Sequence, residues 1–269
     1  MTKDTLHLPW CHAQAITDIG KVRHNNEDRY LLQPWPDGEA ILAVVTDGIG
    51  GNSSGEIAAQ MAVDTFKELL DQPLPLEVKE QYETLVKQCY LADERIREKA
   101  VTSFDTLGMG TTIVAALITP TNCIHIHAGD SRLYHFRKGE IKYQTLDHSI
   151  IQLLLETGRV KPEDISKHPM RSVLNSCLGG KNAQGDFSID PKWQEDDSPV
   201  IVLENEDYFL LCSDGLNNSI SDTMLENLFK EMDIERLNTE LIKSALEHGG
   251  SDNITCLTLK ILTVPLSQI

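Results

Sequence analysis

Residues 41–51 read Ile41-Leu42-Ala43-Val44-Val45-Thr46-Asp47-Gly48-Ile49-Gly50-Gly51, and this stretch decides how the chain folds. Its run of apolar β-formers predicts a buried strand that ends at an aspartate followed by a glycine. A single Asp-Gly pair is weak evidence, because it is also a common hairpin turn. A carboxylate at the end of a buried strand is, however, the donor that a hard divalent cation prefers.

The same arrangement recurs along the chain. Four other acidic elements are Asn26-Glu27-Asp28, Gly129-Asp130-Ser131, Ser213-Asp214-Gly215 and Ser251-Asp252-Asn253. Three of them adjoin short apolar runs, at 124–127, 208–212 and 254–259. Carboxylates at the ends of several buried strands predict a divalent-cation site.

The strongest candidate ligands are Asp47, Asp214 and Asp252, each at the end of a predicted strand. Glu27 and Asp28 are consecutive and therefore face opposite sides of a strand, so we expect one to bind metal directly and the other through water. Gly48 and Gly215 let the backbone approach closely, and a glycine carbonyl can itself bind a hard cation. An oxygen-only set favours magnesium or manganese over zinc.

Two such ions, held roughly 3.5–4 Å apart by a shared carboxylate, form a hydrolytic centre for phosphate. A phosphate substrate also needs a cationic clamp, and Arg23 precedes Glu27 by four residues. Its guanidinium can hold phosphate through two parallel hydrogen bonds. The alternative for Arg23 is a surface ion pair with Glu27 or Asp28, and spacing alone does not separate the two.

Composition narrows the class of protein. The 269 residues carry a net charge of −17, which argues against nucleic-acid binding and against docking on an anionic membrane. The six cysteines form no Cys-x-x-Cys pair, as expected of a reduced cytoplasmic protein. We expect no signal peptide, since the N-terminus lacks an apolar core. The longest apolar runs, 41–45 and 113–118, are far too short to span a bilayer.

Strands and helices occur in separate groups. Strands are predicted at 14–17, 29–33, 41–46, 111–119, 123–127, 132–137, 140–144, 200–203, 208–212 and 254–262. Helices are predicted from a capping box at Ser53 through Leu69, at 85–96, after an N-cap at Asp222, and at 237–246 before Gly249-Gly250. Grouping of this kind predicts an α+β fold of two antiparallel sheets covered by helix pairs.

Residues 145–195 are different in character. Ser149 is a predicted N-cap of a short helix that ends at Gly158, and a loop rich in Pro and Gly follows. Long irregular segments inside compact domains usually form lids or binding loops.

Seven motifs together carry a family resemblance. They are Arg23-x-x-Asn26-Glu27-Asp28, Asp47-Gly48-Ile49-Gly50-Gly51, Gly110-Thr111-Thr112, Gly129-Asp130-Ser131-Arg132, Asp147-His148-Ser149, Ser213-Asp214-Gly215-Leu216 and Asp252-Asn253. In this order the chain resembles the metal-dependent serine/threonine protein phosphatases of the type 2C family, in their compact bacterial form. Ile49 stands where methionine is common, which is a conservative apolar change.

The resemblance implies a four-layer α-β-β-α sandwich with the metals at one edge between the sheets. It implies one domain over residues 12–264, with a flap at 147–190, an N-terminal extension at 1–11 and a C-terminal tail at 265–269. No sensor domain or membrane anchor is expected, so regulation would come from elsewhere.

The resemblance also assigns roles to the acidic residues. It implies that Asp47 bridges two Mn or Mg ions and that the Gly48 carbonyl assists. Asp214 and Asp252 would complete the shell of the first ion, and Glu27 would serve the second. Asp28 would hold water, and Asp130 would belong to a third, weaker site. Arg23 matches the phosphate-binding arginine.

The implied activity is hydrolysis of phosphoserine and phosphothreonine in proteins by a water between the two metals. Partners would be phosphorylated proteins, including a serine/threonine kinase and its targets, and a monomer is favoured. Two alternatives remain, a phosphoprotein-binding pseudophosphatase and a hydrolase of small phosphate esters.

The histidines leave alternatives open. His125 and His127 alternate on one strand and could bind a metal, although hydrogen-bonded structural histidines are commoner. His148 could act as a general acid, but a turn hydrogen bond or helix cap is at least as good a reading, so we leave it outside the catalytic set.

Overall fold

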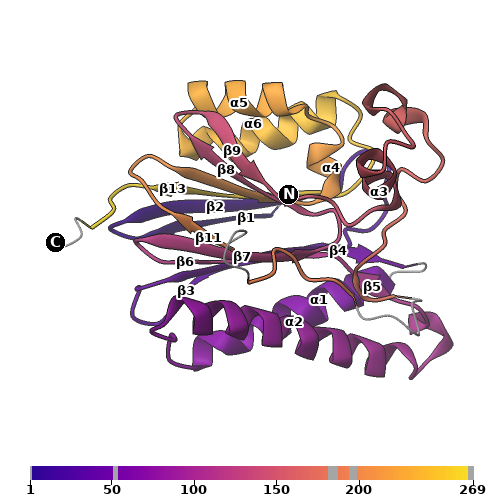
Figure 1. Cartoon of the computed structure of the whole chain (residues 1–269), viewed down its shortest axis with the longest axis horizontal. Coiled ribbons are helices and arrows are strands. Elements are labelled where there is room, and N and C mark those ends of the chain that lie inside the picture. The colour runs from indigo at the N-terminus through magenta and orange to yellow at the C-terminus, as the bar shows by residue number, and fades with distance from the viewer. Residues whose placement is uncertain (1, 51–53, 181–186, 194–198, 266–269) are drawn as a thin grey trace.

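The computed structural model describes residues 2–50, 54–180, 187–193 and 199–265, and they form four layers (Figure 1). Two antiparallel sheets lie face to face in the middle, and a pair of long helices covers the outer face of each. The predicted α+β sandwich is therefore confirmed.

The first sheet has six strands in the order β1-β2-β13-β12-β8-β9. Their bounds are Thr2–His7 (β1), Cys11–Asp18 (β2), Ile254–Ile261 (β13), Tyr208–Cys212 (β12), Arg132–Arg137 (β8) and Glu140–Gln144 (β9). Residues 1–11 are predicted above as an extension, yet Thr2–His7 pairs with β2 as the edge strand of this sheet.

The second sheet has seven strands in the order β10-β5-β4-β6-β7-β11, with β3 also paired to β4. Their bounds are Leu178–Gly179 (β10), Gly110–Thr111 (β5), Ile41–Ile49 (β4), Ile113–Ile118 (β6), Asn122–Ala128 (β7), Val200–Val202 (β11) and Asp28–Pro34 (β3). The predicted strand 111–119 is divided at Thr112, whose amide bonds the Asp47 carbonyl.

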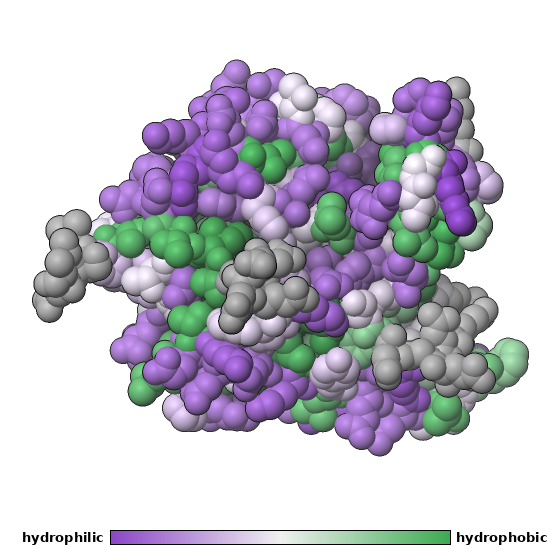
Figure 2. All heavy atoms as spheres, in the orientation of Figure 1, coloured by the Kyte–Doolittle hydropathy of each residue, from purple (hydrophilic) through white to green (hydrophobic). Residues whose placement is uncertain are grey.

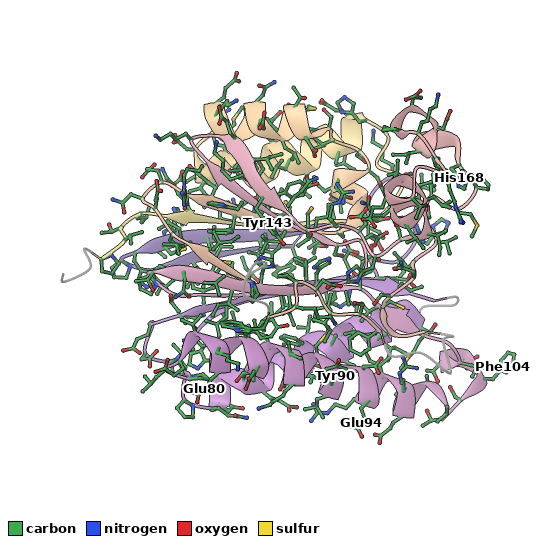
Figure 3. All side chains as sticks on the ribbon, viewed as in Figure 1. Glu80, Tyr90, Glu94, Phe104, Tyr143 and His168 are labelled. Atoms are coloured by element: carbon green, nitrogen blue, oxygen red, sulfur yellow. The ribbon has the colours of Figure 1, made fainter. Side chains whose placement is uncertain are left out.

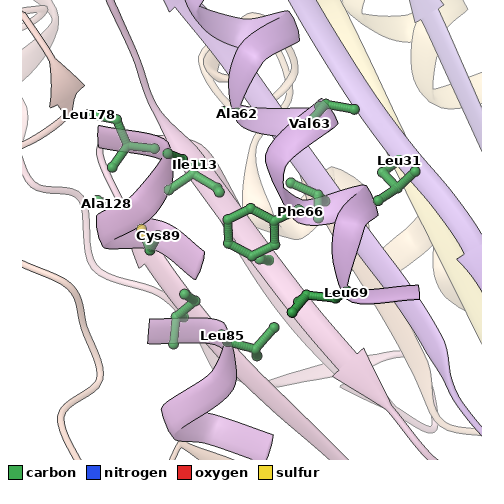
Figure 4. Packing of buried hydrophobic residues seen from close by; sticks show 14 of the residues in the cluster. Leu31, Ala62, Val63, Phe66, Leu69, Leu85, Cys89, Ile113, Ala128 and Leu178 are labelled. Carbon is green, nitrogen blue, oxygen red and sulfur yellow. The ribbon is translucent and has the colours of Figure 1, made fainter. Parts of the chain in front are cut away.

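Helices α1 (Ser54–Lys67) and α2 (Val78–Ala100) cover the second sheet, and α5 (Asp222–Glu231) and α6 (Ile234–Glu247) cover the first. In Figure 4, the ring of Phe66 from α1 lies between Ile113 of β6 and Leu85 of α2, and all three belong to one apolar cluster. The predicted capping box at Ser53 lies outside the described residues. The remaining helical segments are α3 (Ile150–Glu156), α4 (Asp214–Asn217), η1 (Glu68–Asp71), η2 (Phe104–Thr106) and η3 (Pro162–Lys167).

The surroundings of strand β4 explain why its sequence is apolar on both faces. Ile41, Ala43 and Val45 point into the core between the sheets, whereas Leu42 and Val44 point toward the helices. Alternate residues of a strand face opposite ways, so a strand between two apolar layers must be apolar throughout. Its carboxyl end then brings Asp47 to the rim of the sandwich.

Two of the predicted N-caps, Ser149 and Asp222, lie within the described residues. Ser149 does cap α3, since its hydroxyl accepts a hydrogen bond from the Gln152 amide at 3.2 Å. Asp222 does not cap α5: Ser221 does, through the Met224 amide, and Asp222 is the first helical residue. None of the helices within the described residues is long and apolar enough to cross a membrane.

Candidate metal centre

The predicted acidic residues meet at one edge of the sandwich. A cleft of about 990 Å³ is lined by Arg23, Glu27, Asp47, Gly48, Asp130, Asp214 and Asp252 together with parts of the flap. Asp47 lies near the carboxyl end of β4 in one sheet, whereas Asp214 follows β12 and Asp252 precedes β13 of the other. The cleft is therefore built by both sheets, and it collects carboxylates far apart in sequence.

Asp47 has a rigid backbone. Its amide donates to the Thr112 hydroxyl at 3.0 Å, and its carbonyl accepts from the Thr111 hydroxyl at 2.9 Å. The pairing of β3 with β4 sets Asp28 directly opposite Asp47. The two threonines therefore hold the strand end that presents the Asp47 carboxylate.

Asp28 lies behind the cleft and does not line it. Its side chain is buried, and one carboxylate oxygen accepts a hydrogen bond from the Ser213 hydroxyl at 2.7 Å. The other oxygen has no hydrogen-bond partner among the described residues. Glu27, by contrast, lines the cleft, so the two consecutive residues face different ways as the strand geometry predicts.

Asn253 joins three segments that border the cleft. Its side-chain oxygen accepts from the Glu27 amide at 2.8 Å, and its nitrogen donates to the carbonyls of Ile19 and Asn25. This role was not predicted from sequence, although Asn253 belongs to the Asp252-Asn253 motif. A buried amide that uses both its oxygen and its nitrogen fixes the loop that carries Glu27.

Gly48 is needed because β4 passes very close to the start of α1. A side chain at Gly48 would meet the carbonyl of Gly55 at 2.3 Å, and a side chain at Gly55 would meet the backbone of Gly48 at 2.7 Å. Only glycines allow this approach. The backbone of Gly48 is buried but still lines the cleft.

Asp214 begins the short helix α4, which was not predicted. One of its carboxylate oxygens accepts from Asn218, and the other is buried without a partner among the described residues. Asp252 pairs with Arg23 at 2.8 Å, so Arg23 does form an ion pair, but with neither Glu27 nor Asp28. The Arg23 side chain remains 49% exposed, and it lines the cleft beside the carboxylates.

Burial and mutual repulsion disfavour the charged forms of these acids. Burial, followed by the charges of neighbouring aspartates, raises the pKa of Asp47 well above its usual range. The same causes raise the pKa of Asp130 to about 8 and that of Asp214 to about 6. Burial raises the pKa of Asp28 to about 7. Such clustering of perturbed acids is typical of functional sites.

The donor set fits divalent cations. It contains only oxygen ligands, and two buried carboxylate oxygens lack partners, on Asp28 and Asp214. Cations would also offset the burial and the mutual repulsion that raise the pKa values of these acids. Within the described ranges, no three His, Cys, Asp or Glu side chains already close a cage around one point. The fit therefore rests on donor chemistry and charge.

The histidines lie away from this cleft. His127 places its two ring nitrogens 2.9 Å from the Asp190 carbonyl and 2.7 Å from the Leu146 carbonyl, at the two ends of the flap. Burial lowers its pKa to about 4, so the neutral ring can donate only one of these bonds. His125 is buried, with neither nitrogen bonded to a described residue.

His148 contacts the carboxylate of Asp190 at 3.0 Å and lines a separate cavity of about 520 Å³. The structure therefore gives it a structural contact and places it outside the cleft. Part of the predicted flap does border the cleft, through Ser172, Val173, Leu174, Cys177 and Gly180.

Comparison with known proteins identifies the family and the fold. The model of the family described as Protein phosphatase 2C matches residues 21–248. The chain belongs to the protein phosphatase 2C family. The serine/threonine phosphatase stp of Listeria welshimeri is 33% identical over 251 residues, covering 93% of this chain and 95% of that protein.

Solved phosphatases of the protein phosphatase 2C family have the same architecture. The serine/threonine phosphatase of S. agalactiae superposes with a TM-score of 0.85 at 30% identity, over 94% of this chain and 100% of that one. The catalytic domain of PstP, solved in complex with two manganese ions, gives 0.77 at 26% identity, over 94% and 99%. The chain is accordingly a protein-serine/threonine phosphatase.

Proposed function

We propose that this phosphatase hydrolyses phosphoserine and phosphothreonine in proteins with two divalent cations held in the cleft. The observation that carries the proposal is the meeting of Asp47, Asp214, Asp252 and Glu27 beside Arg23 in one cleft. The manganese in the PstP structure supports the choice of manganese or magnesium.

Each residue of the cleft has a proposed part. Asp47 would be shared by the two cations, with the Gly48 carbonyl beside it. Asp214 and Asp252 would help to hold one cation, and Glu27 would help to hold the other. Asp28 would hold water through its free oxygen, and Asp130 would contribute to a weaker third site. When bound, the cations would acidify water and neutralise the charge of the phosphate.

Arg23 orients the substrate. Its guanidinium is half exposed at the rim and already pairs with Asp252 through one nitrogen, Nη2. The fork geometry of arginine lets the remaining donors take up phosphate oxygens. The chain thereby positions the phosphorus over the carboxylates.

We propose direct attack by water, without a phosphorylated enzyme. The thiol that lines the cleft is Cys177, and burial raises its pKa to about 11. It is therefore protonated at neutral pH and a poor nucleophile. The reaction breaks the P–O bond of the ester and transfers the phosphoryl group to the oxygen of water. The leaving oxygen takes up a proton from that water, so the products are the alcohol and inorganic phosphate.

One assay separates this function from its alternatives. Phosphate release from a phosphothreonine peptide, AMP and ATP is followed with Mn²⁺ and with a chelator. We expect peptide turnover that needs Mn²⁺ and exceeds nucleotide turnover in kcat/KM. Peptide binding without turnover would instead indicate a pseudophosphatase, and a preference for nucleotides would indicate a hydrolase of small esters.

A further inference from the structure

An apolar lip stands at the entrance of the cleft. It consists of Phe104 and Leu107, in and just after the 3-10 turn η2 that follows α2. Phe104 is 91% exposed and Leu107 is 62% exposed, yet both line the same cleft as the carboxylates. Figure 3 shows Phe104 projecting at the extreme edge of the molecule, and Figure 2 shows apolar atoms at that edge of a largely hydrophilic face.

The turn below the lip is firmly held. The Thr106 hydroxyl lies within hydrogen-bond distance of the carbonyls of Lys99, Ala100 and Ser103, and the Met109 amide donates to the Thr106 carbonyl. Thr106 and Met109 are buried. The two apolar side chains are therefore presented to solvent by an anchored turn, and the backbone of such a turn loses little entropy on binding.

The flap also contributes apolar groups to the cleft. Val173 and Leu174 line it together with the lip, and Val173 is 40% exposed. The same cleft therefore joins apolar side chains from two segments to the acidic residues.

We infer that the lip binds an apolar side chain of the substrate, one that flanks the phosphorylated serine or threonine. The occupant is a segment of the phosphoprotein substrate, because the lip is continuous with the site where its phosphate reacts. This inference rests on the proposed function and adds sequence selectivity to it. Phe104 and Leu107 are then specificity-determining residues that do not touch the reacting atoms.

The test compares two sets of variants on a panel of phosphothreonine peptides. A leucine is moved through positions −3 to +3 of an otherwise polar peptide, and kcat and KM are measured with Mn²⁺. The variants are the double substitution Phe104→Ser with Leu107→Ser, and the conservative Phe104→Leu. The controls Leu76→Ser and Val101→Ser remove side chains that are 92% and 77% exposed but do not line the cleft.

The wild type is expected to prefer leucine at one or more positions by about five- to tenfold in kcat/KM. The preference should come mainly from a lower KM, and its size is that of one apolar contact. The double variant should lose this preference and keep its rates on the polar peptide and on p-nitrophenyl phosphate within about twofold of the wild type. Phe104→Leu should retain most of the preference, as should both controls.

A wild type without preference at any position would overturn the inference, and so would a preference that survives the double substitution. Either result leaves the proposed function standing. Absence of phosphate release from every phosphopeptide, with p-nitrophenyl phosphate still hydrolysed, would contradict the proposed function and this inference with it.

Discussion

Asp28, Asp47, Asp130 and Asp214 are aspartates whose protonated forms the fold favours, since burial and neighbouring charges raise their pKa values. An unfolded aspartate titrates near pH ~3.9. Between about pH 4 and pH 8 these four aspartates bind more protons in the folded, metal-free protein than in the unfolded chain, so their contribution to stability falls as the pH rises. His125 and His127, whose pKa values burial lowers to about 3 and about 4, oppose this trend below about pH 6.5, because only the unfolded chain protonates them there.

Thermal unfolding of the chelator-treated protein should accordingly show a higher Tm at pH 5 than at pH 8. Added Mn²⁺ should raise the Tm most at pH 8, because cations replace the missing protons. Desolvation raises the pKa of Asp207, but hydrogen bonds from Arg137 and His135 outweigh it and lower that pKa to about 2. Asp207 therefore affects stability only below about pH 4, outside the range from pH 5 to pH 8. A metal-free Tm that climbs from pH 5 to pH 8 would contradict this account.

Arg23 should affect substrate binding more than the fold. Arg23→Ala removes the phosphate clamp from a half-exposed position, so we expect KM for a phosphopeptide to rise about tenfold, the size of a charge-assisted hydrogen bond. Arg95→Ala is the matched control, because Arg95 makes a similar exposed pair with Glu68 away from the cleft. If both variants kept the wild-type KM, Arg23 would be only a surface ion pair.

At the scale of elements, helix α5 tests which residue caps it. Ser221 accepts the Met224 amide, whereas Asp222 only adds charge to the first turn. Ser221→Ala should lower the free energy of unfolding by about 1 kcal/mol, and Asp222→Ala by roughly 0.3–1 kcal/mol. Urea unfolding of both variants gives the order, and a larger loss for Asp222→Ala would reverse the assignment.

The loop that carries Glu27 depends on Asn253. The nearly isosteric change Asn253→Asp removes both donations to Ile19 and Asn25 and adds a charge beside the carboxylates. We expect a loss of about 1–3 kcal/mol in stability, together with weaker Mn²⁺ binding. Calorimetric Mn²⁺ titration checks the second effect, and unchanged affinity would remove Asn253 from the support of the site.

The sequence predicted best those elements whose pattern is local. Strand β12 was placed at its observed bounds, Tyr208–Cys212, and Ser149 caps α3 as its spacing indicates. Errors arose where long-range pairing decides: β1 becomes a strand only by pairing with β2, and Thr112 divides its strand by bonding Asp47.

The candidate site likewise has residues that local motifs predict and residues that only long-range packing places. The acidic residues that line the cleft could be predicted, because each stands in a local motif near the end of a strand. The role of Asn253 and the position of Phe104 could not, since one depends on three segments meeting and the other on a turn that long-range folding brings to the cleft.

At the scale of the whole molecule, the packing of the two sheets sets the distances between the strand ends that carry the acidic residues. Asp47 comes from one sheet and Asp214 and Asp252 from the other, so cations in the cleft would tie the two sheets together. Any ligand that binds only the folded state stabilises it by mass action. Stability and activity should therefore respond to the same divalent cation.

The most direct test is a Mn²⁺ titration of the chelator-stripped protein, read as the rate of phosphate release from a phosphothreonine peptide. The account predicts no release without metal, saturation with rising Mn²⁺ in the wild type, and turnover lower by orders of magnitude in Asp47→Asn, whose far-UV spectrum stays native. Asp47→Asn turning over near the wild-type rate, or release that persists in chelator, would contradict the two-metal centre.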